Sequence, residues 1–462
     1  MEIQCLAASA SPPSVARPGE IVGPVVERLL LYSCTFRTPH LLCAGGIPRS
    51  HLNCLPITRS ENPGTRTPIP LRVLYVSHSF PRRGDPLSNV GGMQRVATGL
   101  HAALAGYPDV DLHSLVLETS WKATPYRMPG YMAGLLRAIP RVVRRERIDV
   151  VLHSSMVTAA TSVAMHGRVG DALLAAIPVG RDVTLPTPGY QWLVPRIFRA
   201  LDLVFPISRA TASECVARGA DPAQVHVVPC GVDTGSFAPP ADRAAARREL
   251  LAAIGESPAT VPDSTLILVS VGRHQERKGF QWFAGEVMPR LPANVLYLVT
   301  GEGPTTPLIQ AAIDRHGLGG RARLLGKVPE TMLRTLYRGG DLFIMPNIHV
   351  PGDIEGFGVV MLEAGLCGLP VLAADIEGIS DVVREGENGH LLPSRDAGAF
   401  ADAVMRYRGD RAALAALSAS AARFTERTFS WTGVAERFVE VFRERIGVPA
   451  AAADAARAVG VR

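Results

Sequence analysis

Short apolar runs rich in β-forming residues alternate with helix-like patterns from residue 71 onward. Such alternation predicts a parallel sheet that is covered by helices on both faces. In the first half of the chain the runs lie at 72–77, 112–117, 149–152, 203–207 and 226–228.

The alternation stops near Val232, where an Ala/Arg-rich helical stretch and several prolines follow. Proline-rich stretches of this kind are typical of connections between domains. The pattern then restarts with runs at 266–271, 295–300, 323–325, 342–345 and 371–373. Two doubly wound halves of this kind leave a cleft between the carboxyl ends of their sheets, where ligands normally bind. The sequence therefore predicts an α/β protein with two Rossmann-like domains that face each other across a cleft.

The beginning and end of the chain do not share this pattern. The first 70 residues mix Pro, Arg, Ser and Cys without periodicity, so we expect a disordered extension there. We expect the last helical pattern to pack back on the first domain and the Ala-rich end to be a frayed tail. The expected boundaries are 1–70 for the extension, 71–232 for the first Rossmann-like domain, 233–262 for the linker, 263–430 for the second Rossmann-like domain, 431–447 for the returning helix and 448–462 for the tail.

Composition limits the classes of function. Of the 462 residues, 47% are hydrophobic and 19% charged, which is ordinary for a globular protein, and no apolar run is long enough to cross a bilayer. The seven cysteines show no metal-binding or disulfide spacing, which favours a reducing cytoplasm. The net charge of +6 fits phosphate-bearing substrates or an anionic membrane surface. No basic stretch is interleaved with aromatic residues, so nucleic acid is disfavoured.

The first motif follows the run at 266–271 and contains Gly272, Arg273 and Lys278 before a helical pattern. Glycine lets the backbone approach a ligand closely, and two cations at the mouth of a sheet suit a diphosphate. Each charge-assisted hydrogen bond there contributes about 1.5–3 kcal/mol. A solvated basic turn is the alternative interpretation.

The second motif is Glu355-Gly356-Phe357-Gly358 followed by Glu363, with seven residues between the two glutamates. A helix beginning near Phe357 would aim its free N–H groups into the cleft. Glu355 would then lie in the loop before the helix and Glu363 about two turns inside it. The carboxylates suit sugar and ribose hydroxyls, although Glu363 could instead cap or salt-bridge a buried helix.

These two motifs, with the strand order and Gly301-Glu302-Gly303-Pro304, resemble glycosyltransferase family 4 of the GT-B type. The resemblance covers roughly residues 71–445 and implies a retaining transfer of a hexose-type sugar from a nucleotide-diphosphate (NDP) sugar, without metal or cofactor. The implied acceptor is a glycan, a lipid-linked glycan or a small molecule, as in polysaccharide biosynthesis. The implied catalytic residues are Arg273 and Lys278 on the diphosphate and Glu355 on the sugar; the implied donor-binding residues are Gly91, Gly92, Gly272, Gly301, Lys327, Val328, Phe357, Gly358, Val359 and Glu363.

The first half agrees less closely with the family. Gly91 and Gly92 resemble its paired glycines, and the lack of a G-x-G-x-x-G after the first strand disfavours a dinucleotide dehydrogenase. Val179 stands where many relatives carry His, which leaves the acceptor-side residue open among three candidates. They are His153, Arg181 and Asp182. The segment 378–381 also departs from the commoner Gly-Gly-x-Pro-Glu pattern.

For two further features, a structural role is favoured over a functional one. Asp109 and Asp111 spell the Asp-x-Asp of metal-dependent glycosyltransferases, but they lie at a predicted turn far in sequence from the phosphate motif. An arginine cluster at 137–147 lies on a helical stretch that Pro140 is expected to interrupt, and a solvated face is favoured over docking on anionic lipid. We therefore expect a cytoplasmic protein, with peripheral membrane contact as an open alternative.

Two rivals to transferase activity stay open. An epimerase or hydrolase acting on an NDP-sugar would turn over its donor without an acceptor. A non-catalytic partner subunit of a polysaccharide-assembly complex would be expected to lose the phosphate-binding cations, yet Arg273 and Lys278 are both present.

Overall fold

The computed structural model describes residues 70–85, 91–165, 167–187 and 189–447. These described residues belong to one compact unit. The expected extension, apart from Pro70, and the expected tail lie outside the described residues. Among those that are described, no helix is both long and apolar enough to cross a membrane.

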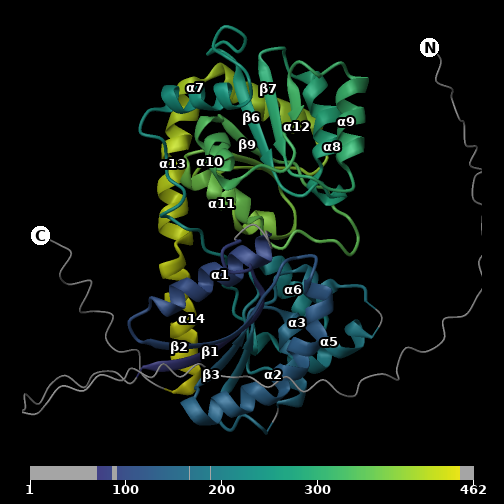
Figure 1. The fold of residues 1–462 in the computed structure, drawn as a ribbon. Coiled ribbons are helices and arrows are strands. Elements are labelled where there is room, and N and C mark those ends of the chain that lie inside the picture. Colours follow the sequence, from purple (N-terminus) through teal and green to yellow (C-terminus); the bar gives the residue numbers. More distant parts are fainter. Residues whose placement is uncertain (1–69, 86–90, 166, 188, 448–462) are drawn as a thin grey trace, which may run out of the picture. The chain divides into compact units, whose positions relative to one another are not determined.

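The first half of the chain builds a parallel sheet, of which Figure 1 labels β1, β2 and β3. The strand order is β2-β1-β3-β4-β5. Its central strands are buried on both faces, which explains why their sequences are almost wholly apolar. The strands are β1 (Leu71–Phe80), β2 (Val110–Glu118), β3 (Val150–His153), β4 (Leu173–Ala176) and β5 (Leu203–Val204).

The second half builds another parallel sheet, in the order β11-β10-β9-β6-β7-β8. The strand order reverses direction between β6 and β9, and ligands bind at such switch points, outside the carboxyl ends of the strands. The strands are β6 (Leu266–Val271), β7 (Val295–Thr300), β8 (Ala322–Leu324), β9 (Leu342–Met345), β10 (Val371–Ala374) and β11 (Gly389–Leu392).

Helices connect the strands of both sheets, as parallel pairing requires, and three more helices follow the last strand. In the first half they are α1 (Gly92–Ala105), α2 (Thr124–Glu146), α3 (Met156–Ala159), α4 (Arg181–Thr184), α5 (Tyr190–Arg199) and α6 (Arg209–Ala217). From the linker onward they are α7 (Arg243–Ala253), α8 (Phe280–Trp282), α9 (Thr306–Arg315), α10 (Glu330–Gly339), α11 (Val359–Leu366), α12 (Ala397–Gly409), α13 (Arg411–Phe429) and α14 (Trp431–Ile446).

The two-sheet α/β fold is confirmed, and the differences from expectation are local. The expected strand at 226–228 is wrong. The N–H groups of His226 and Val228 donate to the carbonyls of Val204 and Pro206, but the pairing stays an isolated bridge between Val204 and Val225, because Pro206 and Pro229 have no N–H to continue a ladder. β4 and β11 were not predicted, since Leu-Leu-Ala-Ala and Gly-His-Leu-Leu have little β-forming bias. Pro140 does not interrupt α2.

The chain crosses twice between the two halves, and the crossings pair with each other. The backbone of Val232 donates to the carbonyl of Phe429 at 2.8 Å. Trp431, at the start of α14, fits between two glycines, because a Cβ at Gly99 or Gly231 would lie 2.3 or 2.4 Å from its ring. Glycine is therefore required at both positions by close approach.

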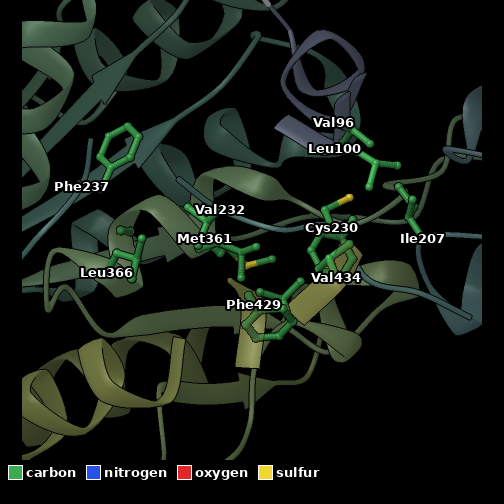
Figure 2. Packing of buried hydrophobic residues seen from close by; sticks show 14 of the residues in the cluster. Val96, Leu100, Ile207, Cys230, Val232, Phe237, Met361, Leu366, Phe429 and Val434 are labelled. Carbon is green, nitrogen blue, oxygen red and sulfur yellow. The ribbon is translucent and has the colours of Figure 1, made fainter. Parts of the chain in front are cut away.

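A continuous hydrophobic cluster includes side chains of both halves. Figure 2 shows Val96 and Leu100 of α1, Met361 of α11, and Phe429 and Val434 beside the second crossing. The apolar side chains around this crossing thus form part of the protein core and hold α1, α11 and α14 together.

Candidate active site

Of the first motif's cations, Lys278 lies in a short helical turn at Glu276–Lys278, and Arg273 lies in the loop between β6 and this turn. The side chain of Lys278 is only 8% exposed, and its Nζ lies 2.6 Å from Oε2 of Glu355. Burial acts to raise the pKa of Glu355, but Lys278 and Arg277 outweigh it and hold that pKa below its usual value. A buried, ionised Lys–Glu pair is therefore the centre of the site.

Arg277 is a member of this cluster that the sequence analysis missed. Its Nη1 lies 2.9 and 3.1 Å from the two carboxylate oxygens of Asp353, and its Nε lies 3.4 Å from Glu355. Arg273 is more exposed; burial, followed by the nearby charges of Arg277 and Arg181, lowers its pKa. Three residues separate Arg273 from Arg277 in the run Arg-His-Gln-Glu-Arg-Lys, and this short spacing could have indicated that the cations lie close together.

Glu355 lies in a tightly packed loop, as predicted. Asn347 donates from Nδ2 to Oε2 of Glu355 at 3.2 Å, so this one oxygen has several donor partners. Phe357 is buried, and Gly358 has a φ of 86°, which favours glycine. Helix α11 begins at Val359, two residues after the expected start.

Glu363 is buried on α11 with 2% of its side chain exposed. The hydroxyl of Tyr337 donates to its Oε2 at 3.0 Å, and Arg95 of α1 forms an ion pair with it. Its carboxylate therefore already has partners from both halves of the chain, and Arg95 is a second residue that the sequence analysis missed.

The expected nucleotide-binding loops pack backbone to backbone at the ends of β6, β7 and β8. A Cβ on Gly301 would lie 1.9 Å from the carbonyl oxygen of Gly272, so only glycine fits there. The N–H of Gly301 in turn donates to the carbonyl of Gly326 at 2.8 Å. Lys327 follows in an exposed position and Val328 is half-buried. These loops form one edge of the site.

The acceptor-side candidates differ from one another in environment. His153 at the end of β3 is fully buried, with Nε2 3.2 Å from Oγ of Ser162 and Nδ1 unpartnered, and burial lowers its pKa to about 3. Asp182 accepts the N–H groups of Met156 and Val179 at 2.9 and 2.8 Å. Burial outweighs these bonds and raises the pKa of Asp182 to about 6. Asp182 therefore holds the backbone at Met156 and at Val179 together.

Arg181 is half exposed and lies 3.5 Å from Asp353, the carboxylate that also binds Arg277. The paired glycines Gly91 and Gly92, at the start of α1, have open space where a Cβ would stand. Of the first-half candidates, Arg181 is thus the one that an ion pair links to the charged cluster.

Three glycines bring the two halves into contact beside Glu355. A Cβ on Gly356 would lie 2.3 Å from the carbonyl oxygen of Val179, and one on Gly378 would lie 2.0 Å from the carbonyl oxygen of Gly356. Gly180, with a φ of 103°, lies against Gly356 on the same side. The two segments that depart from the family pattern, at 179 and at 378–381, therefore meet at one place.

The Asp-x-Asp pair has other partners. Asp109 binds Arg443 of α14 at 3.1 Å, and Asp111 lies 3.5 Å from His113. Within the described ranges, no group of three or more His, Cys, Asp or Glu side chains could hold a metal ion.

Comparison with known proteins decides the family. The model of "Glycosyltransferase Family 4" matches residues 90–236, and that of "Glycosyl transferases group 1" matches residues 265–410. A D-inositol 3-phosphate glycosyltransferase of Xylanimonas cellulosilytica is 33% identical over 330 residues, which cover 70% of this chain and 71% of the relative. The chain belongs to glycosyltransferase family 4.

Other relatives of this family 4 glycosyltransferase match over less of their length. D-inositol 3-phosphate glycosyltransferases of Nocardia farcinica and Mycobacterium tuberculosis are 35% and 33% identical, over 48% and 58% of this chain. The chain spans about half the length of these two relatives, 48% and 53%.

Solved structures share the GT-B fold of this family 4 glycosyltransferase. Anabaena HepE in complex with UDP and glucose has a TM-score of 0.61 at 16% identity and covers 81% of this chain and all of its own. Sucrose-phosphate synthase from Thermosynechococcus elongatus has a TM-score of 0.64 at 18% identity, covering 82% of this chain and 99% of its own.

Proposed function

We propose that this glycosyltransferase moves a hexose-type sugar from an NDP-sugar to a hydroxyl acceptor, with retention of configuration and without a metal ion. The observation that carries the proposal is the buried Lys278–Glu355 pair, with Arg277 and Arg273 beside it at the carboxyl end of β6. The HepE structure in complex with UDP and glucose supports an NDP-sugar donor for this fold.

In this proposal the cations stabilise the departing diphosphate. Negative charge grows on the diphosphate as the anomeric C–O bond breaks, so fixed positive charge counts most in the transition state. Arg273 and Lys278 bind the diphosphate, with the N–H groups at the start of α11 contributing near Gly358. They supply the charge stabilisation that a metal ion supplies in other enzymes.

Glu355 is proposed to face the sugar, not to attack it. Its Oε2 interacts with Lys278, Arg277 and Asn347, which keeps the carboxylate ionised and fixed. We therefore favour attack by the acceptor oxygen on the face that the diphosphate leaves. The new C–O bond forms as the old one breaks, the bonding electrons go to the diphosphate, and a diphosphate oxygen takes the acceptor proton.

The remaining donor contacts are proposed from position. The edge formed by Gly272, Gly301, Lys327 and Val328 would hold the base, and Glu363 would hold the ribose, exchanging Arg95 or Tyr337 for the two ribose hydroxyls. The first sheet would then carry the acceptor, at the end of β3 near His153 and Arg181. Because the relatives are D-inositol 3-phosphate glycosyltransferases, a small polyol phosphate is one candidate acceptor, beside glycans and lipid-linked glycans.

We also propose a cytoplasmic location, because the described cysteines Cys215, Cys230 and Cys367 are free thiols. Peripheral membrane contact would fall on the first half, where Trp121 is exposed just before the arginine-rich helix α2 and Tyr126 is exposed in its first turn. Binding to anionic and neutral vesicles at low and high salt would separate this alternative from a solvated face.

A donor screen tests the proposed function. Purified protein is combined with UDP- and GDP-sugars, first without and then with an acceptor panel that includes D-inositol 3-phosphate. We expect thermal stabilisation by one donor and a product whose mass equals acceptor plus hexose. Donor breakdown that is equally fast without acceptor would instead favour a hydrolase, and an epimerised donor would favour an epimerase. Stabilisation without any turnover would favour the non-catalytic partner subunit.

A further inference from the structure

Glu377 has a backbone conformation that side chains other than glycine rarely adopt. Its φ is 52°, in the left-handed region, and it directly precedes the segment 378–381 that departs from the Gly-Gly-x-Pro-Glu pattern. A glycine would take this conformation at lower free energy. The other described non-glycine residues with positive φ, Arg147 and Arg395, lie at exposed helix boundaries. Glu377 is the member of this group that lies at the candidate active site.

The carboxylate of Glu377 reaches the loop that carries Glu355. Its Oε2 accepts the backbone N–H of Glu355 at 2.5 Å, and its Oε1 lies 3.2 Å from Nδ1 of His349. The side chain is 12% exposed, whereas that of His349 is 68% exposed. The carboxylate is therefore fixed against the sugar-facing loop but is still accessible from solvent.

Two carboxylates on neighbouring loops meet here, and both keep acceptor positions. Glu355 is buried and bound to Lys278, Arg277 and Asn347 through Oε2. Glu377 has one backbone N–H and one exposed imidazole, and a carboxylate offers about four acceptor positions. Glu377 thus has free acceptor capacity beside the diphosphate-binding cations.

The neighbouring backbone fixes where this carboxylate lies. The N–H of Gly378 donates to the carbonyl of Glu355 at 3.1 Å, and Gly378 packs against Gly356, which in turn touches Val179. The loop of Glu377 therefore lies at the contact between the two halves, where the reacting sugar must be held for transfer. If Glu377 only held the Glu355 loop in place, the hydrogen bond from the backbone N–H of Glu355 would be its whole role. The remaining acceptor positions of its carboxylate leave room for a second partner.

We propose that Glu377 determines donor specificity by accepting a hydrogen bond from a hydroxyl group of the transferred sugar. The ligand class is a neutral hexose with a hydroxyl at the contacted position. This inference rests on the proposed function, because it places the sugar of the donor beside Glu355. His349 is the group that this hydroxyl would join or displace at Oε1.

The test compares Glu377→Gly and Glu377→Gln with the wild-type protein. The probes are UDP and GDP alone, UDP-glucose and GDP-mannose, and the monodeoxy analogues of both sugars. Glu377→Gly should fold, because the strain that it relieves offsets the lost hydrogen bonds. Arg147→Gly is the matched control, since it relieves the same backbone strain at the exposed end of α2.

We expect Glu377→Gly to bind the bare nucleotide within twofold of wild type and to lose at least about tenfold in kcat/KM for the parent donor, as for a hydrogen bond to a charged group. One deoxy analogue should instead react equally with both proteins, because it lacks the hydroxyl that Glu377 contacts. Glu377→Gln, which keeps an acceptor oxygen, should lie in between, and Arg147→Gly should match wild type.

Equal loss for the parent donor and every deoxy analogue would overturn the inference and leave Glu377 as a loop clamp only. Unchanged kinetics in Glu377→Gly would overturn it as well. Failure of the proposed function is a different result, because then the wild-type protein itself would bind none of the nucleotides or donors.

Discussion

The carboxyl edges of the two sheets carry opposite kinds of polar group. At the first sheet, Ser77, His78, His153 and Ser154 form a neutral edge, because burial lowers the pKa of the two histidines to about 4 and about 3. At the second sheet, Arg277, Lys278, Asp353 and Glu355 form a charged edge.

The contrast between a neutral and a charged edge indicates what each half can contribute to a transfer reaction. Fixed charge is useful where charge develops, which is at the departing diphosphate. An acceptor hydroxyl needs orientation and hydrogen bonds rather than a strong field, and neutral side chains provide these at a smaller desolvation cost.

Removing the charge of Lys278 should have the largest effect. We expect Lys278→Met to lower kcat about 10²–10³-fold with a smaller change in donor affinity, because the ammonium acts most strongly in the transition state. Methionine keeps the buried stem, and Arg277 and Asn347 continue to bind Glu355. Steady-state kinetics with circular dichroism would measure this, and Lys122→Met on the exposed surface is the matched control. Wild-type turnover by folded Lys278→Met would contradict the proposed role.

Titration of the neutral edge should affect stability at low pH. The folded-state pKa of His153 lies at about 3, below the usual 6.5, so the unfolded chain binds the proton first as pH falls. Stability from this group is present above pH 6.5 and is lost progressively towards pH 3, by about 3 kcal/mol at pH 4.

The substitution His153→Gln should therefore flatten the fall in unfolding free energy between pH 6.5 and 4, measured by urea denaturation. Asp182 changes in the opposite sense: its pKa is raised to about 6, so its stability contribution is lost as pH rises through that value. Asp182→Asn is thus a useful partner variant. Identical pH profiles for wild type and His153→Gln would contradict the buried neutral imidazole.

Loss of Glu363 should have a moderate effect on the charged edge. If it holds the ribose, its contact changes little between ground and transition states, so Glu363→Gln should raise the donor KM about tenfold and leave kcat nearly unchanged. From the sequence, Lys278 and Glu363 are expected to line a cleft and not to matter for folding. The structure shows both side chains buried, so each substitution can also lower the stability of the protein. Thermal unfolding is therefore recorded beside the kinetics, and a fall in kcat alone would contradict the ribose role.

Removal of divalent cations should have the smallest effect. We expect turnover in excess chelator to stay within twofold of the untreated enzyme, since the cations of the charged edge are part of the chain. Activity that vanishes in chelator and returns with Mg²⁺ or Mn²⁺ would point back to Asp109 and Asp111.

The sequence predicted the charged edge better than the neutral edge. Lys278 and Glu355 lie in the segments that follow the buried strands β6 and β9, so their convergence follows from the parallel topology. The same reasoning could not give Arg95 or Glu377, because their partners are 268 and 22 residues away in sequence and depend on how two loops meet. The left-handed backbone of Glu377 is likewise a property of the folded loop, not of the residue type.

Trp431 gives the chain crossing its own fluorescent side chain. Its indole lies between Gly99 and Gly231, where α1, the first crossing and α14 meet, while Trp121 and Trp192 are 66% and 65% exposed. Quenchers in solution should reach the two exposed indoles first, which leaves an emission component dominated by the less accessible tryptophans. In a protein with Trp121→Phe, Trp192→Phe and Trp282→Phe, Trp431 is the one tryptophan left. Its fluorescence lifetime would then report changes in packing at the chain crossing, and so movement of the two halves, without an attached dye.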